Sequence, residues 1–384
     1  MYSIKTMNKI SKLGLDLLDK SKYTCSDDAV NADAILVRSA SLHEVEFESS
    51  IKAIARAGAG VNNIPIDRCT EQGIVVFNTP GANANAVKEL VVLGLLISSR
   101  KVAPSLEWIK TLKGSGDEVS KLVEKGKGQF VGPEIMGKTL GVIGLGAIGA
   151  LVANAAVALG MKVCGYDPFL SVEGALRISN EVEYLKTQDE VYAKSDYITL
   201  HIPATAETKG SINAAAIAKM KDGVRLLNFS RGELVVSGDI LAALKSGKMS
   251  TYVTDFASDD IIGEENVVAF PHLGASTPES EDNCAKMAVL QTADYLENGN
   301  IVNSVNIPAV KVARGSGARI TVIYKDGEDM VSKITNAAKL DIESVNSKVK
   351  KDVGYAVIDL KGDAPKDAAE AISKVNGVIK VNLF

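Results

Sequence analysis

The 384-residue sequence predicts an α/β protein with a doubly wound parallel sheet at its centre and a ferredoxin-like domain at its end. Apolar, strand-like runs alternate with helical segments through the first 300 residues. A glycine triad at positions 144, 146 and 149 lies between two such runs. The last 67 residues follow the order strand, helix, strand, strand, helix, strand. These three observations together give the fold class.

The first hundred residues are expected to form a small α/β domain. Apolar runs at Ala34–Val37, Ile51–Ala55 and Ile74–Phe77 are bounded by charges or glycine, as is typical of strands. A crossover helix is expected near Glu89–Arg100. Residues Lys113–Gly128 are polar and rich in glycine, so the next domain is expected to begin after them.

A glycine fingerprint follows the first strand of the central sheet. Leu140–Ile143 lead into Gly144, Gly146 and Gly149, which have the spacing G-x-G-x-x-G. Gly144 would make a tight turn, Gly146 would let the backbone approach a pyrophosphate, and Gly149 would let the next helix pack on the strand. Glycines also gather in ordinary turns, but the strand before the fingerprint and the helix after it favour a dinucleotide site.

An acidic residue stands where such a site needs one. Asp167 follows a second apolar strand, Met161–Tyr166, and lies 23 positions after Gly144. Its carboxylate would bond the ribose hydroxyls and repel a 2′-phosphate, which favours NAD over NADP. Residues 140–161 would also satisfy a hydropathy test for a membrane helix, because only Asn154 in them is polar. Their five glycines favour a buried strand, turn and helix instead.

Four further units and a last strand complete the expected sheet. They are strand Tyr197–Leu200, helix Ala214–Met220, strand Val224–Phe229, helix Ser237–Ser246 and a strand near Tyr252–Thr254.

The C-terminal domain is expected to start near Ala318, after a stretch with Pro and Gly that resembles a linker. Its predicted elements, in order, are Arg319–Tyr324, Met330–Lys339, Ile342–Val349, Tyr355–Leu360, Asp367–Val375 and Val378–Leu383.

Composition limits the kinds of partner. A net charge of −4 without a basic cluster gives no footprint for nucleic acid or a membrane surface, so small-molecule partners are expected. The N-terminus has no apolar signal-peptide core, and the four cysteines are scattered without C-x-x-C spacing. We therefore expect a cytoplasmic protein with structural thiols and no metal site.

Three polar segments follow apolar runs and are candidates for the chemistry. They are Asn228–Gly232, Asp255–Asp260 and Pro271–Thr277. Ligands of a doubly wound sheet bind outside the carboxyl ends of its strands, so these segments are expected to converge on the cofactor.

His272 is the best candidate to accept a hydroxyl proton among the three histidines, and Arg231 could clamp a substrate carboxylate. An alternative is that His272 only precedes a helix that begins near Ser276 with capping-box spacing. His201, at a strand end, is better explained by packing. His43 lies in a helix-start pattern and fits a solvated surface.

With these segments in order, the chain resembles the D-isomer-specific 2-hydroxyacid dehydrogenases over nearly its whole length. In that family the motif around Arg231 supplies the substrate arginine, and the motif Pro271–Thr277 supplies the catalytic histidine, here His272. A glutamate of the family stands 29 residues after the arginine, where this chain has Asp260. Asp260 is one methylene shorter, and Glu264 or Glu265 could replace it if the loop is remodelled.

The resemblance also implies the domain boundaries and the cofactor contacts. It implies a discontinuous, flavodoxin-like substrate domain (1–92 and 284–305), an NAD domain (93–283), a linker (306–317) and an ACT-like regulatory domain (318–384). The expected cofactor-binding residues are Gly144, Gly146, Ala147, Ile148, Gly149, Asp167, Pro203, Thr208, Ser230, Asp255 and Gly274.

The substrate-side wall implied by the resemblance comprises Leu36–Ser39, Arg56–Asn63 and Asn78–Asn83. The resemblance also implies the substrate-binding residues Arg38, Ser39, Arg56, Gly60, Val61 and Lys88. A phosphate needs several cations or N–H donors, which is consistent with the three cations among them.

For activity, the resemblance implies NAD-dependent oxidation of 3-phospho-D-glycerate to 3-phosphohydroxypyruvate, the first step of L-serine biosynthesis. The alternatives are a dehydrogenase or reductase for glycerate or hydroxypyruvate, and a catalytically weak protein that senses NAD. A homodimer or homotetramer is implied as well. An amino-acid effector would bind the C-terminal domain, but the loop Tyr324–Asp329 lacks the His/Asn-rich pattern expected for serine.

Overall fold

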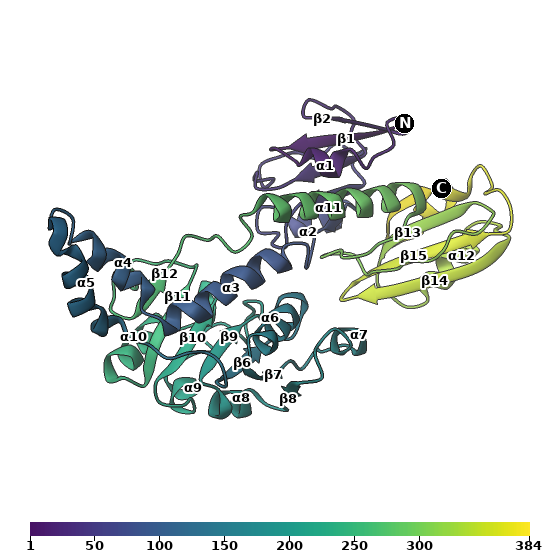
Figure 1. Cartoon of the computed structure of the whole chain (residues 1–384). Helices are drawn as coiled ribbons and strands as arrows, with labels where there is room; N and C mark the ends of the chain where they lie inside the picture. Colours follow the sequence, from purple (N-terminus) through teal and green to yellow (C-terminus); the bar gives the residue numbers. More distant parts are fainter. The chain divides into compact units, whose positions relative to one another are not determined.

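The computed structural model describes all 384 residues, which divide into two compact units (Figure 1). Unit 1 comprises Met1–Asn83 and Pro278–Phe384, and unit 2 comprises Ala84–Thr277. The chain therefore leaves unit 1 after residue 83 and returns to it at residue 278. The predicted division into three domains with a linker stays a prediction.

Unit 2 is built on a seven-stranded sheet with the order β12-β11-β10-β9-β6-β7-β8, in which every paired strand is parallel. The chain order reverses between β6 and β9, and ligands of doubly wound sheets bind at the carboxyl ends of the strands at such a point. The strands are β6 (Thr139–Ile143), β7 (Lys162–Tyr166), β8 (Val182–Tyr184), β9 (Tyr197–Leu200), β10 (Val224–Asn228), β11 (Met249–Thr254) and β12 (Val267–Ala269). This confirms the predicted doubly wound sheet.

The helices of unit 2 accompany these strands (Figure 1). They are α3 (Ala84–Ser99), α4 (Val102–Lys110), α5 (Val119–Gly126), α6 (Ala147–Ala158), α7 (Val172–Ala175), α8 (Gln188–Lys194), α9 (Ala214–Ala218) and α10 (Ser237–Ser246). No helix of the protein is both long enough and apolar enough to cross a membrane. The apolar residues 140–161 form β6, a turn and α6.

One expected helix of unit 2 begins earlier than predicted, and one polar segment contains a helix that was not predicted. The crossover helix α3 begins at Ala84 and not near Glu89, because Ala84, Ala86 and Val87 are buried and tertiary packing extends the helix. The polar segment Lys113–Gly128 contains α5, whose apolar and polar residues alternate with helical spacing.

The N-terminal part of unit 1 contains a parallel sheet with the order β2-β1-β3-β4-β5, which is the flavodoxin-like order. Its elements are β1 (Tyr2–Met7), α1 (Lys12–Leu15), β2 (Tyr23–Ser26), β3 (Ala34–Val37), β4 (Ala53–Arg56), α2 (Ile66–Glu71) and β5 (Val75–Phe77). Helix α11 (Pro278–Asn298) runs beside α1, where a Cβ on Gly14 would lie 2.7 Å from Ala285 (Figure 1). The long return helix therefore completes this part of unit 1.

The C-terminal part of unit 1 forms an antiparallel sheet with the order β14-β15-β13-β16, which is the ferredoxin-like arrangement. Its elements are β13 (Arg319–Lys325), α12 (Met330–Asn336), β14 (Ile342–Lys350), β15 (Val353–Leu360), α13 (Ala368–Ser373) and β16 (Val378–Leu383). All six elements were predicted from the sequence; β16 has the predicted ends, and the other five differ only in where they begin or end.

Both faces of this antiparallel sheet are covered. Alternate residues such as Val322 and Ile358 share a core with Ile334 of α12 and Ile372 of α13. The residues between them, including Tyr355 and Val357, join the core of the N-terminal sheet and α11. A strand buried on both faces has no polar alternation, which explains the continuous apolar runs of β13 and β15.

Candidate active site

The three glycines of the fingerprint occupy positions that explain their spacing. Gly144 has φ +91°, and a Cβ on it would lie 2.5 Å from the carbonyl oxygen of His201. A Cβ on Gly149 would lie 1.9 Å from the Gly144 oxygen, so α6 starts in direct contact with the turn. By contrast, nothing lies within 4 Å of a Cβ on Gly146. This open space is where a phosphate would approach the backbone.

The start of α6 is suited to an anion. Gly146 is the N-cap, and no side chain caps the free N–H groups of the first turn, which includes Ala147, Ile148 and Gly149. Uncapped N–H groups and the helix dipole attract a phosphate. The predicted pyrophosphate site therefore fits the local backbone.

Asp167 is held against the glycine loop at the end of β7. Its Oδ2 accepts the backbone N–H of Leu145 at 2.9 Å, and its Oδ1 accepts that of Phe169 at 2.9 Å. The carboxylate is thus fixed where the fingerprint turns, as recognition of ribose hydroxyls requires.

The loop after β9 carries Pro203 and Thr208. The Thr208 hydroxyl donates to the Pro203 carbonyl oxygen at 2.6 Å and closes the loop on itself. His201 precedes this loop, and its Nε2 lies 3.0 Å from the Thr199 hydroxyl. Burial lowers the pKa of His201 to about 3. His201 is therefore neutral near pH 7, in agreement with the packing interpretation.

Asn228 begins the predicted segment Asn228–Gly232, and its side chain, to which no role was assigned from the sequence, shapes the turn that presents Arg231. Its Oδ1 accepts the backbone N–H groups of Ser230 and Arg231 at 3.2 and 3.3 Å. Its Nδ2 donates to the Arg231 carbonyl oxygen at 2.8 Å. The Ser230 hydroxyl donates to the Ile202 carbonyl oxygen at 2.6 Å and ties this turn to the neighbouring loop. A buried asparagine at a strand end was the available signal.

Asp255 is the buried carboxylate of the site. The residue is 1% exposed, and its Oδ2 accepts the backbone N–H of Gly274 at 3.0 Å. Its Oδ1 is buried without any hydrogen-bond partner. Burial raises the pKa of Asp255, although the charges of His272 and Arg231 act in the opposite direction. Asp255 therefore lies in the electric field of both predicted catalytic side chains.

Phe256 positions His272 directly. The two ring centroids are 4.7 Å apart at an interplanar angle of 47°. Because Asp255 binds Gly274, two consecutive residues after β11 hold the loop from 272 to 274. The structure thus brings Arg231, Asp255, His272 and Gly274 together within unit 2.

Asp260 has other partners. Its carboxylate accepts a hydrogen bond from the Ser258 hydroxyl at 2.5 Å. Hydrogen bonds from Ser258 and then Ser237 lower the pKa of Asp260. A role for Asp260 beside His272 stays a prediction.

The predicted substrate-side residues of unit 1 cluster after β3 and β4. The guanidinium of Arg38 forms an ion pair with Glu281 at 2.6 Å, and its carbonyl oxygen accepts Arg56 Nε at 3.0 Å. A Cβ on Gly58 would lie 2.5 Å from Arg56 Nη1, so glycine makes room for this arginine.

The remaining predicted substrate residues lie nearby in the chain or in unit 2. The Ser39 N–H donates to Asn8 Oδ1 at 3.3 Å, while Gly60 and Val61 are half-buried in the loop after β4. Lys88 belongs to unit 2, on α3, with its Nζ 3.7 Å from Glu89. Convergence of the two sets stays a prediction. No group of three His, Cys, Asp or Glu residues could hold a metal ion.

The sequence of this chain is similar to those of one family of known proteins. Residues 96–274 match the NAD binding domain of the D-isomer specific 2-hydroxyacid dehydrogenases. The chain is 34% identical to the D-3-phosphoglycerate dehydrogenase of Synechocystis, over 81% of this chain and 57% of that protein. It is 31% identical to the enzyme of that name from Bacillus subtilis, over 90% of this chain and 66% of the relative. The chain therefore spans less than two thirds of the length of these relatives.

A solved structure agrees with this match. The crystal structure of an NAD+-bound 3-phosphoglycerate dehydrogenase from Entamoeba histolytica aligns with a TM-score of 0.60 and 27% identity. The alignment covers 79% of this chain and 98% of that chain.

Proposed function

The chain belongs to the D-isomer-specific 2-hydroxyacid dehydrogenase family, and from this premise we propose that it oxidises 3-phospho-D-glycerate to 3-phosphohydroxypyruvate with NAD. This reaction is the first step of L-serine biosynthesis. The observation that carries the proposal is the grouping of His272 and Arg231 around the buried carboxylate of Asp255, in the unit that holds the glycine fingerprint. The names of the relatives supply the substrate.

In this proposal, His272 takes the proton of the substrate 2-hydroxyl group. Arg231 binds the substrate carboxylate with its planar fork of N–H donors. Phe256 keeps the His272 ring in place, and the charge of His272 acts on the nearby buried carboxylate of Asp255. Bound NAD would accept the hydride from C2.

The residues of unit 2 fit NAD. The space beside Gly146 and the uncapped start of α6 suit the pyrophosphate, and Asp167 suits the ribose. The unpartnered Oδ1 of Asp255 is an acceptor for an amide donor such as the nicotinamide carboxamide. The pyrophosphate, one ribose and the nicotinamide thus each have a matching group.

A second candidate is the oxidation of an unphosphorylated acid such as D-glycerate, or the reverse reaction on hydroxypyruvate. It is favoured by one observation: Glu281 already pairs with Arg38, which removes one of the cations predicted to bind the phosphate. The other cations predicted to bind the phosphate are Arg56 and Lys88, and the Nζ of Lys88 lies 3.7 Å from Glu89.

The test is the initial rate of NADH formation with 3-phosphoglycerate and with D-glycerate, for the wild type and for His272→Ala. Turnover of the phosphorylated acid alone, abolished in the variant, supports the leading proposal. Equal or faster turnover of D-glycerate supports the second candidate. Binding of NAD without turnover of either acid supports the catalytically weak, NAD-sensing alternative.

The proposal also includes a homo-oligomer and an effector site in the C-terminal part. Helices α4 and α5 bury no residue, and Val102, Leu106 and Ile109 are exposed, which supports a homo-oligomer. The loop Tyr324–Asp329 lines a cavity of about 410 Å³, which supports an effector site in the C-terminal part. Sedimentation measurements and effector titrations test these two points.

A further inference from the structure

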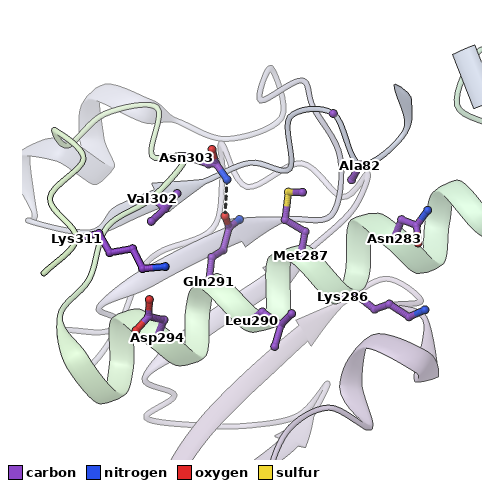
Figure 2. A pocket seen from close by; sticks show the side chains of 11 residues that line it. Ala82, Asn283, Lys286, Met287, Leu290, Gln291, Asp294, Val302, Asn303 and Lys311 are labelled. Atoms are coloured by element: carbon purple, nitrogen blue, oxygen red, sulfur yellow. Dashed lines mark hydrogen bonds between the residues drawn. The ribbon is translucent and has the colours of Figure 1, made fainter. Parts of the chain in front are cut away.

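A groove of about 580 Å³ runs along α11 in unit 1 (Figure 2). None of its lining residues is assigned above to catalysis or to the cofactor, and only Gly81 and Ala82 belong to the predicted substrate-side wall. One wall is α11, and the other is formed by the chain around residues 81–82 and 302–311. Its volume is within the range of sites for small organic molecules, roughly 300–1,000 Å³.

The middle of the groove is apolar. Met287 and Leu290 project from α11, and Val302 comes from the opposite wall (Figure 2). Leu290 is 56% exposed, although the other face of the same helix is buried in the core. A ligand that covers these side chains removes apolar surface from water, which favours binding.

The ends of the groove carry cations. Lys311 lies at one end and Lys286 near the other (Figure 2). Neither lysine takes part in any ion pair of the protein within 4 Å. Asp294 is the only carboxylate that lines the groove, and its Oδ1 already accepts the side-chain amides of Asn298 and Asn300 at 2.9 and 3.0 Å. The groove therefore has a net positive charge.

The wall between these ends is preformed. Gln291 is 9% exposed, and its Nε2 donates to the Asn78 carbonyl oxygen at 2.8 Å. Its Oε1 accepts Nδ2 of Asn303 at 3.3 Å, so the two walls are linked by a hydrogen bond (Figure 2). A ligand would find this side chain already oriented, which lowers the entropy cost of binding.

We propose that this groove binds a small organic carboxylate with an apolar body. The carboxylate pairs with Lys311, and the apolar body covers Met287, Leu290 and Val302. A ligand with no charge would leave the lysine unpaired, and a fully polar anion would leave the apolar floor exposed to water. The proposal is independent of which hydroxy acid the enzyme oxidises.

The experiment is calorimetric titration of the full chain with 4-phenylbutanoate, its neutral analogue 4-phenylbutanamide and 2-amino-4-phenylbutanoate. The variants are Lys311→Met, Leu290→Asp and, as a matched control, Lys20→Met, which removes an exposed lysine that does not line the groove. Arg231→Ala reports binding at the substrate site instead. Thermal unfolding of every variant shows whether it folds.

We expect the acid to bind, the amide to bind at least tenfold more weakly, and Lys311→Met to weaken the acid about tenfold. Leu290→Asp should abolish binding, and Lys20→Met should leave it unchanged. If 2-amino-4-phenylbutanoate binds more tightly than 4-phenylbutanoate, the ligand class is an amino acid. If it binds more weakly, the ligand class is a simple organic acid. Equal binding of acid and amide, loss of binding only in Arg231→Ala, or no binding to the folded wild type overturns the proposal.

Discussion

Replacement of Arg319 by methionine should sharply destabilise unit 1. The guanidinium is fully buried, and all five of its N–H donors are used. It forms a bidentate ion pair with Asp359, at 2.7 and 3.0 Å. Its other three N–H groups donate to carbonyl oxygens at the end of α11 and in the segment that follows α11. One side chain thus joins the C-terminal sheet to the rest of unit 1.

The magnitude follows from what the substitution leaves behind. Asp359 is 4% exposed, and without Arg319 its remaining partner is the Ser344 hydroxyl at 3.4 Å. A buried charge that loses its partner costs about 3–5 kcal/mol. At about 2–4 °C per kcal/mol for a unit of this size, the transition of unit 1 should fall by roughly 6–20 °C.

The assay is thermal unfolding monitored by circular dichroism, with Asp359→Leu and the double variant as controls. The double variant removes both charges, so it should recover most of the loss, because the penalty comes from the orphaned charge and not from the lost pair. The reasoning is refuted if the free energy of unfolding of Arg319→Met lies within about 1 kcal/mol of the wild-type value. It is also refuted if the stability loss of the double variant equals the sum of the losses of the two single variants.

Three further predictions concern the site and the junction of the sheets. Gly146→Ala should keep the fold and weaken NAD binding about tenfold, as calorimetry would measure. Gly149→Ala should lower the free energy of unfolding, measured by urea titration, by about 1–3 kcal/mol, because a Cβ on Gly149 meets the backbone and a Cβ on Gly146 does not. Equal stability of the two variants would contradict the assignment. Asp255→Asn should raise the free energy of unfolding of the apo-protein by about 1 kcal/mol at pH 7, since burial raises the pKa of this carboxylate. The rate of NADH formation should fall at least a hundredfold. A variant less stable than the wild type would show that the buried carboxylate does not destabilise the fold. Burial, and then the charge of Lys52, lowers the pKa of Lys380 to about 8. The unfolded chain therefore binds more protons between about pH 8 and pH 10.5, and wild-type stability should rise with pH in this window relative to Lys380→Met; urea midpoints that keep a constant difference at pH 7.5 and 9.5 would show that Lys380 does not titrate there.

The sequence predicted elements best where a local pattern coincided with tertiary packing. Strand Val378–Leu383 and helix Ser237–Ser246 were predicted with their observed ends. A glycine with positive φ marks one end of each, Gly377 before the strand and Gly247 after the helix. Strand β1 was missed because only Ile4 of its six residues is fully buried, so the segment does not stand out as an apolar run. Such a strand is determined by its pairing with strands distant in the sequence, which a local sequence pattern does not show.

The same division holds for the site. The glycine fingerprint was readable because each glycine answers a local steric demand. The link from Asp255 to Gly274 joins two loops 19 residues apart, and Asn228 acts through three bonds to its own turn. Neither has a spacing rule that a sequence displays, and the pairing of Arg38 with Glu281 bridges residues 243 apart.

The most direct test of the proposed reaction is the fate of the hydrogen at C2 of the substrate. The enzyme should be incubated with NAD and 3-phosphoglycerate deuterated at C2, and the reduced cofactor should be analysed by mass spectrometry. The account predicts that the reduced cofactor carries the deuterium and that its formation disappears in His272→Ala. Reduced cofactor without deuterium, or equal formation in the variant, would contradict it.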